Sequence, residues 1–276
     1  MQHPLALHHL SLLDVAPEDL PAIAREAGFS RVSVFVMPPS VNLDIFPRVE
    51  PGKSCRAFTS ACRASGVSVH NIDVFSVGPD TRIQDLEAAL DLGAEIGAER
   101  LTALVQDPDR GRAAERLADL SEAAECRDIE VSIEFMKFSA LRSITAGADF
   151  VAQVGHSNLS LLVDPLHLTR TAGTIAELKA LDPKFIGAAQ FCDGPLAAPA
   201  NAFIEAVEDR GIPGEGEFPL IDFLLCLPSH CPLDIEVPLK RLSDVGCTPM
   251  ERARLLYDAA VTYLTAAARR ETTGAE

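Results

Sequence analysis

The amino-acid sequence predicts one α/β domain, a single (β/α)₈ barrel of the TIM type. Short apolar runs alternate with helical patterns along the whole chain, eight such runs are present, and 276 residues is close to the roughly 250 of this fold. An open doubly wound sheet is the rival, but it needs a glycine-rich phosphate loop after its first strand, and residues 11–16 contain no glycine. We expect the barrel to span residues 1–270 and residues 271–276 to form a disordered polar tail.

The expected strands are short and strongly apolar. The run from Leu159 to Val163 has only one polar residue, which is typical of a parallel strand buried on both faces. The eight expected strands cover residues 5–12, 31–36, 67–74, 101–105, 129–135, 159–164, 185–191 and 233–237.

The segments between the strands carry helical patterns. The first has Pro17 at an early helical position and stops at Gly28, the residue types that favour these two places. The third places Ile83, Leu86 and Leu90 on roughly one stripe. The expected helices cover residues 17–27, 52–65, 82–97, 112–126, 143–154, 174–181, 219–227 and 249–268.

Charge and composition argue against several classes of partner. The formal net charge is −16, whereas proteins that bind nucleic acid or anionic membranes present lysine and arginine, so we expect neither partner. The seven cysteines form no C-x-x-C pair, and we find neither a signal peptide nor an apolar run of about 18 residues. We therefore expect a cytoplasmic enzyme with reduced thiols and a small-molecule substrate; a homo-oligomer remains open.

Four consecutive expected strands end in an oxygen donor: Glu134, Asp164, Gln190 and Glu236. The carboxyl ends of the strands meet at the catalytic face of a TIM barrel, so these side chains should lie on one arc. Three carboxylates converge there only around a cation. A donor set without sulfur or imidazole favours Mn²⁺ or Mg²⁺ over Zn²⁺, and Co²⁺ should substitute. The alternative for each acidic residue is a helix N-cap or a solvated turn.

Further polar residues adjoin these ends. His167, three residues after Asp164, is a candidate for acid–base catalysis or for a hydrogen bond to a substrate hydroxyl, with a loop-capping histidine as the alternative. His70 in the third strand either reaches the pocket and contacts substrate or is a satisfied barrel histidine. Lys137 is either a cation for an enolate or phosphate or a solvated rim lysine. Cys192 is expected to point away from the site and pack.

The segment 209–219 is rich in glycine and proline and adjoins the expected metal site. Arg210 at its start could clamp a substrate oxyanion or phosphate. Glycines 211, 214 and 216 would let backbone amides approach an anion. The alternative is an ordinary turn before a helix.

At these residues the sequence resembles the xylose-isomerase-like barrel superfamily, the sugar phosphate isomerase/epimerase group. The matching pieces follow the same order over nearly the whole chain: SIEF, VDPLHL, QFCD, RGIPGEGEFPL and DIEVP. The resemblance implies that Glu134, Asp164, Gln190 and Glu236 bind the metal and that His167 and Arg210 contact substrate. Ketose 3-epimerases of the group carry histidine at the position of Gln190. Glutamine there is more similar to the 3-dehydroshikimate dehydratases.

The resemblance implies proton abstraction next to a carbonyl, with the enediolate stabilised by the metal. If Glu134 or Glu236 takes the proton and the other returns it, the enzyme is an isomerase or epimerase of a small sugar, sugar phosphate or keto-polyol. If a β-hydroxyl leaves instead, with His167 or His70 as the acid, it is a dehydratase. The third hypothesis is a non-catalytic barrel that binds metal only structurally.

Overall fold

A computed structural model describes residues 3–38 and 46–273. All eight strands are parallel, each pairs with the next along the chain, and β8 returns to β1 to close the barrel. The strands are β1 (Leu5–His8), β2 (Arg31–Phe35), β3 (Ser68–Val77), β4 (Ala98–Val105), β5 (Glu130–Glu134), β6 (Leu159–Val163), β7 (Ile186–Phe191) and β8 (Leu233–Ile235). The predicted single (β/α)₈ barrel is confirmed.

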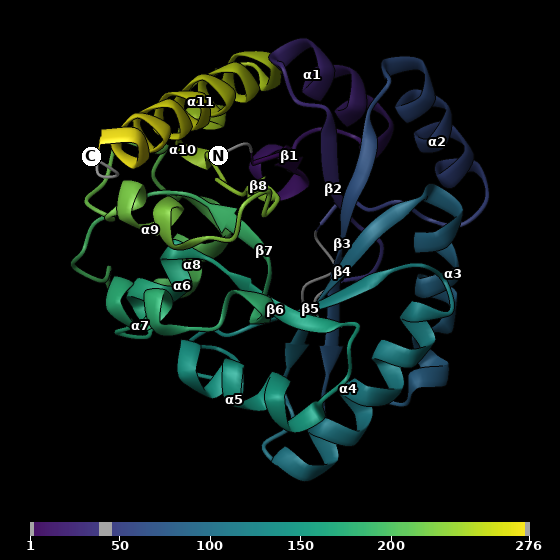
Figure 1. Ribbon diagram of the computed structural model, residues 1–276. Coiled ribbons are helices and arrows are strands. Elements are labelled where there is room, and N and C mark those ends of the chain that lie inside the picture. Colours follow the sequence, from purple (N-terminus) through teal and green to yellow (C-terminus); the bar gives the residue numbers. More distant parts are fainter. Residues whose placement is uncertain (1–2, 39–45, 274–276) are drawn as a thin grey trace.

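The helices surround this ring of strands, as Figure 1 shows. The α-helices are α1 (Leu20–Ala27), α2 (Lys53–Ser65), α3 (Glu87–Ile96), α4 (Arg110–Glu125), α5 (Ile144–Val154), α6 (Pro165–Arg170), α7 (Ile175–Ala180), α8 (Ala202–Glu208), α9 (Leu220–Cys226), α10 (Lys240–Asp244) and α11 (Pro249–Thr273). Four short 3₁₀ segments accompany them, η1 (His9–Leu12), η2 (Pro17–Asp19), η3 (Ile83–Asp85) and η4 (Pro183–Phe185).

Every expected strand is present, with shifted ends. The first stops at His8, because the backbone N–H of Leu10 donates to His8 Nδ1 and turns the chain into η1. The third runs on to Val77, three residues beyond the expected end. These shifts decide which side chains reach the mouth of the barrel.

The differences among the helices concern short elements and the C-terminal end. The helices α6, α8 and α10 have five to seven residues each, too short for a sequence period to reveal them. Helix α11 continues to Thr273, so residues 271–273 of the expected tail are helical. Residues 274–276 lie outside the described part of the chain. Within that part, no helix combines the length and the hydropathy needed to cross a membrane.

Close packing fixes the first and last helices against each other. Gly28 ends α1 with φ 115°, and a Cβ there would lie 2.6 Å from the Tyr257 ring of α11. Only glycine fits this position, because the backbone is left-handed and the ring leaves no room. The last helix is thereby seated beside the first, next to the closing strands β1 and β8 (Figure 1).

Candidate metal and substrate site

The four oxygen donors expected at the mouth lie at or beside the ends of their strands. Glu134 ends β5, Asp164 and Glu236 each follow the last residue of β6 and β8, and Gln190 is the penultimate residue of β7. All four are buried, with exposed fractions of 6% for Glu134, 0% for Asp164, 2% for Gln190 and 7% for Glu236. A set of buried carboxylates needs compensating positive charge.

Arg210 supplies part of that charge. Its Nη1 donates to Asp164 Oδ2 at 2.8 Å, and its Nη2 lies 2.6 Å from Glu236 Oε2. Its Nε donates to the carbonyl of Ala206 at 3.0 Å. Burial alone would lower the pKa of Arg210, but the carboxylates of Glu236 and Asp164 outweigh it and raise the pKa. The guanidinium is therefore a permanent cation held between two of the expected ligands.

Glu134 has no such partner. Its pKa is raised well above the usual value by burial and by the nearby carboxylates of Glu236 and Asp164. Its Oε1 makes no hydrogen bond to any described residue, although His167 Nε2 lies 3.4 Å away. Burial lowers the pKa of His167 to about 4, so the imidazole is neutral near pH 7.

Part of the donor set lies close enough together to share a divalent metal. One ligand atom each of Glu134, Asp164 and His167 lies within 4.8 Å of the others. Glu134 Oε1 and Gln190 Oε1 are each buried without a hydrogen-bond partner among the described residues, which costs free energy unless a cation or a donor binds them. A second cation is present, because burial alone would lower the pKa of His8 but Glu236, Asp234 and Asp73 raise it to about 10. Arg210 and His8 together still face five carboxylates, so the chemistry of the set calls for further positive charge. His167 also lies within reach, which the sequence did not suggest for a ligand.

Asp164 serves two structural purposes at once. Its Oδ1 accepts the backbone N–H of Leu166 at 2.7 Å and caps the short helix α6, while its Oδ2 faces Arg210. The helix-capping alternative is confirmed for this residue, while its second oxygen still faces the site. The cap also orients α6, whose third residue is His167.

A cavity of about 300 Å³ opens above these groups. Its polar floor contains Glu134, His167, Arg210 and Glu236. Two pairs of rings stand in its walls: Phe35 and Phe46 are stacked with centroids 5.0 Å apart, and Phe138 and Phe203 meet edge to face at 6.0 Å. The remaining lining residues are Leu10, Val74, Ser76, Leu104, Gln106, Met136, Ala206 and Val207.

A buried hydrogen-bonded chain that the sequence did not reveal reaches Glu236 from the other side of the barrel. Thr102 accepts from Asn71, Asn71 donates to Asp73, and His8 Nε2 hydrogen-bonds Asp73. His8 Nδ1 lies 3.5 Å from Glu236 Oε1. Of the adjacent histidines that end β1 and begin η1, His8 is the one that faces the site.

Two residues expected at the substrate lie elsewhere. His70 is the third residue of the ten-residue strand β3, so it sits deep in the barrel, with Nδ1 3.6 Å from Glu99 at the start of β4. The residues of β3 that line the cavity are Val74 and Ser76. Lys137 is exposed and does not line the cavity. The structure therefore fits the alternatives, a buried barrel histidine and a solvated rim lysine.

Cys192 lies at the site, contrary to the expectation that it points away. Its Sγ donates to Asp164 Oδ1 at 3.4 Å and lies 3.8 Å from Arg210 Nη1. Burial and Asp164 raise the pKa of this thiol well above its usual value, so it remains protonated. Strand alternation puts residues 190 and 192 on the same side, a signal that was present in the sequence.

The glycine-rich segment does hold an anion, and that anion belongs to the protein. Asp193 Oδ2 accepts the N–H of Gly214 at 2.9 Å, and its Oδ1 accepts the N–H of Phe218 at 3.0 Å. One of the three glycines expected to approach a substrate anion, Gly214, thus has its amide occupied by this carboxylate.

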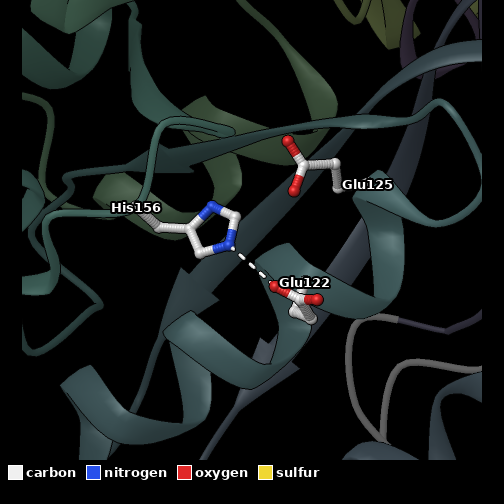
Figure 2. A group of neighbouring side chains, drawn as sticks. All are labelled: Glu122, Glu125 and His156. Atoms are coloured by element: carbon white, nitrogen blue, oxygen red, sulfur yellow. Dashed lines mark hydrogen bonds and ion pairs between the residues drawn. The ribbon is translucent and has the colours of Figure 1, made fainter.

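A second group of potential ligands lies on the outer surface (Figure 2). It comprises Glu122, Glu125 and His156, and both glutamates are exposed. His156 Nδ1 accepts the backbone N–H of Asn158 at 3.1 Å, so the proton of the neutral ring sits on Nε2, the nitrogen that faces Glu122 at 3.5 Å. That nitrogen has no lone pair free for a metal, and we assign no site to the group.

Comparisons with solved structures agree with this fold. A xylose isomerase-like TIM barrel/4-hydroxyphenylpyruvate dioxygenase fusion protein has a TM-score of 0.82 at 20% identity, over 99% of this chain and 45% of the other. The chain thus spans under half the length of that protein. The IOLI protein, solved with a bound zinc atom, gives 0.78 at 17% identity over 95% and 98% of the two chains. D-psicose 3-epimerase from Clostridium cellulolyticum, solved with D-tagatose, gives 0.72 at 13% identity, also over 95% and 98%.

Identities this low establish a shared fold alone. None of the curated proteins compared with the chain matches it significantly. The family model described as xylose isomerase-like TIM barrel matches residues 21–227, which is most of the chain. The chain therefore belongs to the family of xylose isomerase-like TIM barrels.

Proposed function

We propose that this protein is a divalent-metal-dependent enzyme of the isomerase or epimerase type, which removes a proton next to the carbonyl of a small hydroxylated substrate. One observation carries the proposal: Glu134, Asp164 and Glu236 are buried at the mouth of a closed barrel, and one oxygen each of Glu134 and Gln190 has no hydrogen-bond partner among the described residues. The metal we propose for Glu134, Asp164, Gln190 and Glu236 is Mn²⁺ or Mg²⁺, with Co²⁺ as a substitute. When bound, it would act as a Lewis acid on the substrate carbonyl.

We assign the proton transfers and the binding of substrate hydroxyls to protein side chains. Glu134 lines the cavity, and a carboxylate that held the metal through one oxygen would keep its other oxygen to accept the substrate proton. Glu236 is held by Arg210 and is the second carboxylate able to hold a proton at the cavity floor. His167, neutral near pH 7, is positioned to hydrogen-bond a substrate hydroxyl. Phe35 and Phe46 are buried and make their side of the cavity apolar.

The cavity favours an unphosphorylated substrate. Among the described residues that line it, Arg210 is the only lysine or arginine, and its guanidinium is bound by Asp164 and Glu236. The segment 39–45 contains no lysine or arginine in the sequence either. A phosphate ester would bring a charge of nearly −2 into an apolar surrounding without a matching cation.

A dehydratase is the second candidate, and the apolar walls favour it. Each hydroxyl of an open-chain sugar would need a partner, and one facing a phenylalanine would have none. A cyclic keto-polyol that loses water would present more C–H surface to these walls. The resemblance of Gln190 to the glutamine of 3-dehydroshikimate dehydratases points the same way. The carboxyl that takes the substrate proton would then return it to the leaving hydroxyl, and His167, which lines the cavity, would hydrogen-bond that hydroxyl.

The test is exchange of a carbon-bound proton by the Mn²⁺-loaded protein in D₂O. Trial substrates are D-fructose, D-ribulose and fructose 6-phosphate for the isomerase, and inosose and 3-dehydroshikimate for the dehydratase. An isomerase gives a product that differs in composition from the substrate only by deuterium in place of hydrogen. A dehydratase gives a product that has lost one water. Glu134→Gln should abolish either reaction, while Glu130→Gln, the same change at the other end of β5, should retain it. A wild-type protein that binds no divalent cation refutes both candidates.

A further inference from the structure

Asp193 is a buried carboxylate just beyond the end of β7, with an exposed fraction of 1%. It accepts three backbone hydrogen bonds, from Gly194 at 2.8 Å and Phe218 at 3.0 Å to Oδ1 and from Gly214 at 2.9 Å to Oδ2. Its own backbone pairs in both directions with Gly211, at 2.9 and 2.8 Å. One residue thus binds segment 209–219 at its beginning, middle and end.

The glycines of this segment are explained by that contact. A Cβ at Gly216 would lie 2.3 Å from Asp193 Oδ1 and 2.4 Å from the backbone nitrogen of Gly194. A Cβ at Gly211 would lie 2.9 Å from the backbone carbonyl carbon of Asp193. All three distances are shorter than any ordinary contact, so the segment approaches Asp193 as closely as it does only because these positions carry no side chain.

Arg210 lies between two backbone bridges. Gly211 on one side pairs with Asp193, and Asp209 on the other pairs with Leu239. The N–H of Arg210 itself donates to the carbonyl of Pro238 at 3.0 Å. The position of its Cα is therefore fixed by backbone bridges on both sides. From that position the guanidinium reaches Asp164, at 2.8 Å.

We propose that Asp193 is a positioning residue for Arg210: its carboxylate binds the backbone N–H groups of segment 209–219 and so holds the guanidinium against Asp164 and Glu236. The inference relies on the proposed function only for the role of Arg210 at a metal and substrate site. The anchoring itself is a property of the chain and is testable without a substrate.

The experiment is a double-mutant cycle on the full-length protein with Asp193→Ala, Arg210→Met and the double variant. The readouts are the dissociation constant for Mn²⁺ by calorimetry and the urea midpoint of the chelator-treated protein. Asp193→Asn is the mild variant, because its one amide oxygen can still accept from Gly194 and Phe218. Asn158→Ala is the structural control: it removes two side-chain hydrogen bonds to the backbone, to Ser121 and Ile129, far from Arg210.

We expect Arg210→Met to tighten Mn²⁺ binding on the order of tenfold, because it removes a cation beside two ligand carboxylates. Asp193→Ala should tighten it in the same direction, Asp193→Asn should do so less, and the double variant should bind no more tightly than Arg210→Met alone. Asn158→Ala should lower the urea midpoint without changing Mn²⁺ affinity. A wild-type Mn²⁺ affinity in Asp193→Ala, or additive effects in the double variant, would overturn the proposal.

Failure of the proposed function leaves a different signature. If the wild type binds no Mn²⁺, the proposed metal site is refuted. The positioning role of Asp193 is then tested by the urea midpoints of the single and double variants alone. A double variant that loses less stability than the sum of the single variants, while Asn158→Ala and Arg210→Met add, supports the coupling of Asp193 to Arg210. Simple additivity for Asp193 and Arg210 refutes it.

Discussion

Arg210→Met offers the sharpest test of the electrostatics at the barrel mouth. The exchange keeps an unbranched apolar stem and deletes the one guanidinium that lies between Asp164 and Glu236. Arg210 is only 4% exposed, so the carboxylates left behind stay buried. Removing one partner of a buried ion pair costs about 3–5 kcal/mol. At about 2–3 °C per kcal/mol for a chain of this size, the melting temperature of the chelator-treated variant should fall by roughly 6–15 °C.

Added Mn²⁺ should reverse most of that loss. A divalent cation among Glu134, Asp164 and Glu236 replaces the missing charge, and a ligand that binds the folded state more tightly raises its stability further. The rise in melting temperature on adding Mn²⁺ should therefore be larger in Arg210→Met than in the wild type. Circular dichroism melts with and without Mn²⁺ measure both quantities.

Arg252→Met is the matched control. Arg252 is also buried, with a 2% exposed fraction, and pairs with Asp14 away from the three carboxylates. This variant should also melt at a lower temperature, but Mn²⁺ should raise it no more than it raises the wild type. The reasoning is refuted if chelator-treated Arg210→Met melts within about 2 °C of the wild type, or if Mn²⁺ stabilises both arginine variants equally.

Three further outcomes follow from single contacts. The pKa of Glu134 is raised in the fold, so its contribution to stability is present below the unfolded value of about 4.3 and is lost as the pH rises through the folded value. Metal-free Glu134→Gln should therefore be more stable than the wild type near pH 8, and that gain should disappear near pH 4, as urea unfolding at the two pH values would show. Gly187→Ala should cost about 1–3 kcal/mol, because its Cβ would lie 2.0 Å from Ser160 Oγ and 2.8 Å from Arg100 Nη1; calorimetry should find part of the loss restored by adding Ser160→Gly. Thr174→Ala should cost about 1 kcal/mol in urea unfolding, since it removes the cap of α7.

The sequence was sufficient for the strand-end donors because a closed parallel barrel brings every strand's carboxyl end to the same face. To place Glu134, Asp164 and Glu236 at that face, it was enough to identify each strand and the residue at which it ends. His70, in contrast, does not line the cavity, and the reason lies in its depth along the strand. A period of two residues gives the side of a strand that a residue faces, and depth along the barrel depends on where the strand begins and ends. Since β3 extends to Val77, His70 lies near the far end of the barrel.

The contacts of segment 209–219 could not be predicted from the sequence, because every residue except proline has a backbone amide and residue type does not reveal which amide binds. The spacing of glycines 211, 214 and 216 correctly indicated that amides approach an anion, but nothing in the composition of the segment named Asp193 as that anion. The contact joins residues 193 and 214 across the inserted helix α8, whose seven residues gave no detectable period. Long-range pairing of this kind is determined by the closed barrel, which holds the end of β7 beside segment 209–219.

That internal anion changes what the site requires of a substrate. A glycine-rich loop with an arginine suggested a receptor for a phosphate or carboxylate outside the protein. In the fold, Asp193 takes the amides of Gly214 and Phe218, while Asp164 and Glu236 take the guanidinium of Arg210. The positive groups of this region are thus already neutralised by the chain. We therefore expect a neutral hydroxy-ketone to bind better than a phosphate ester, which would have to displace one of these carboxylates at the cost of leaving it buried and unpaired.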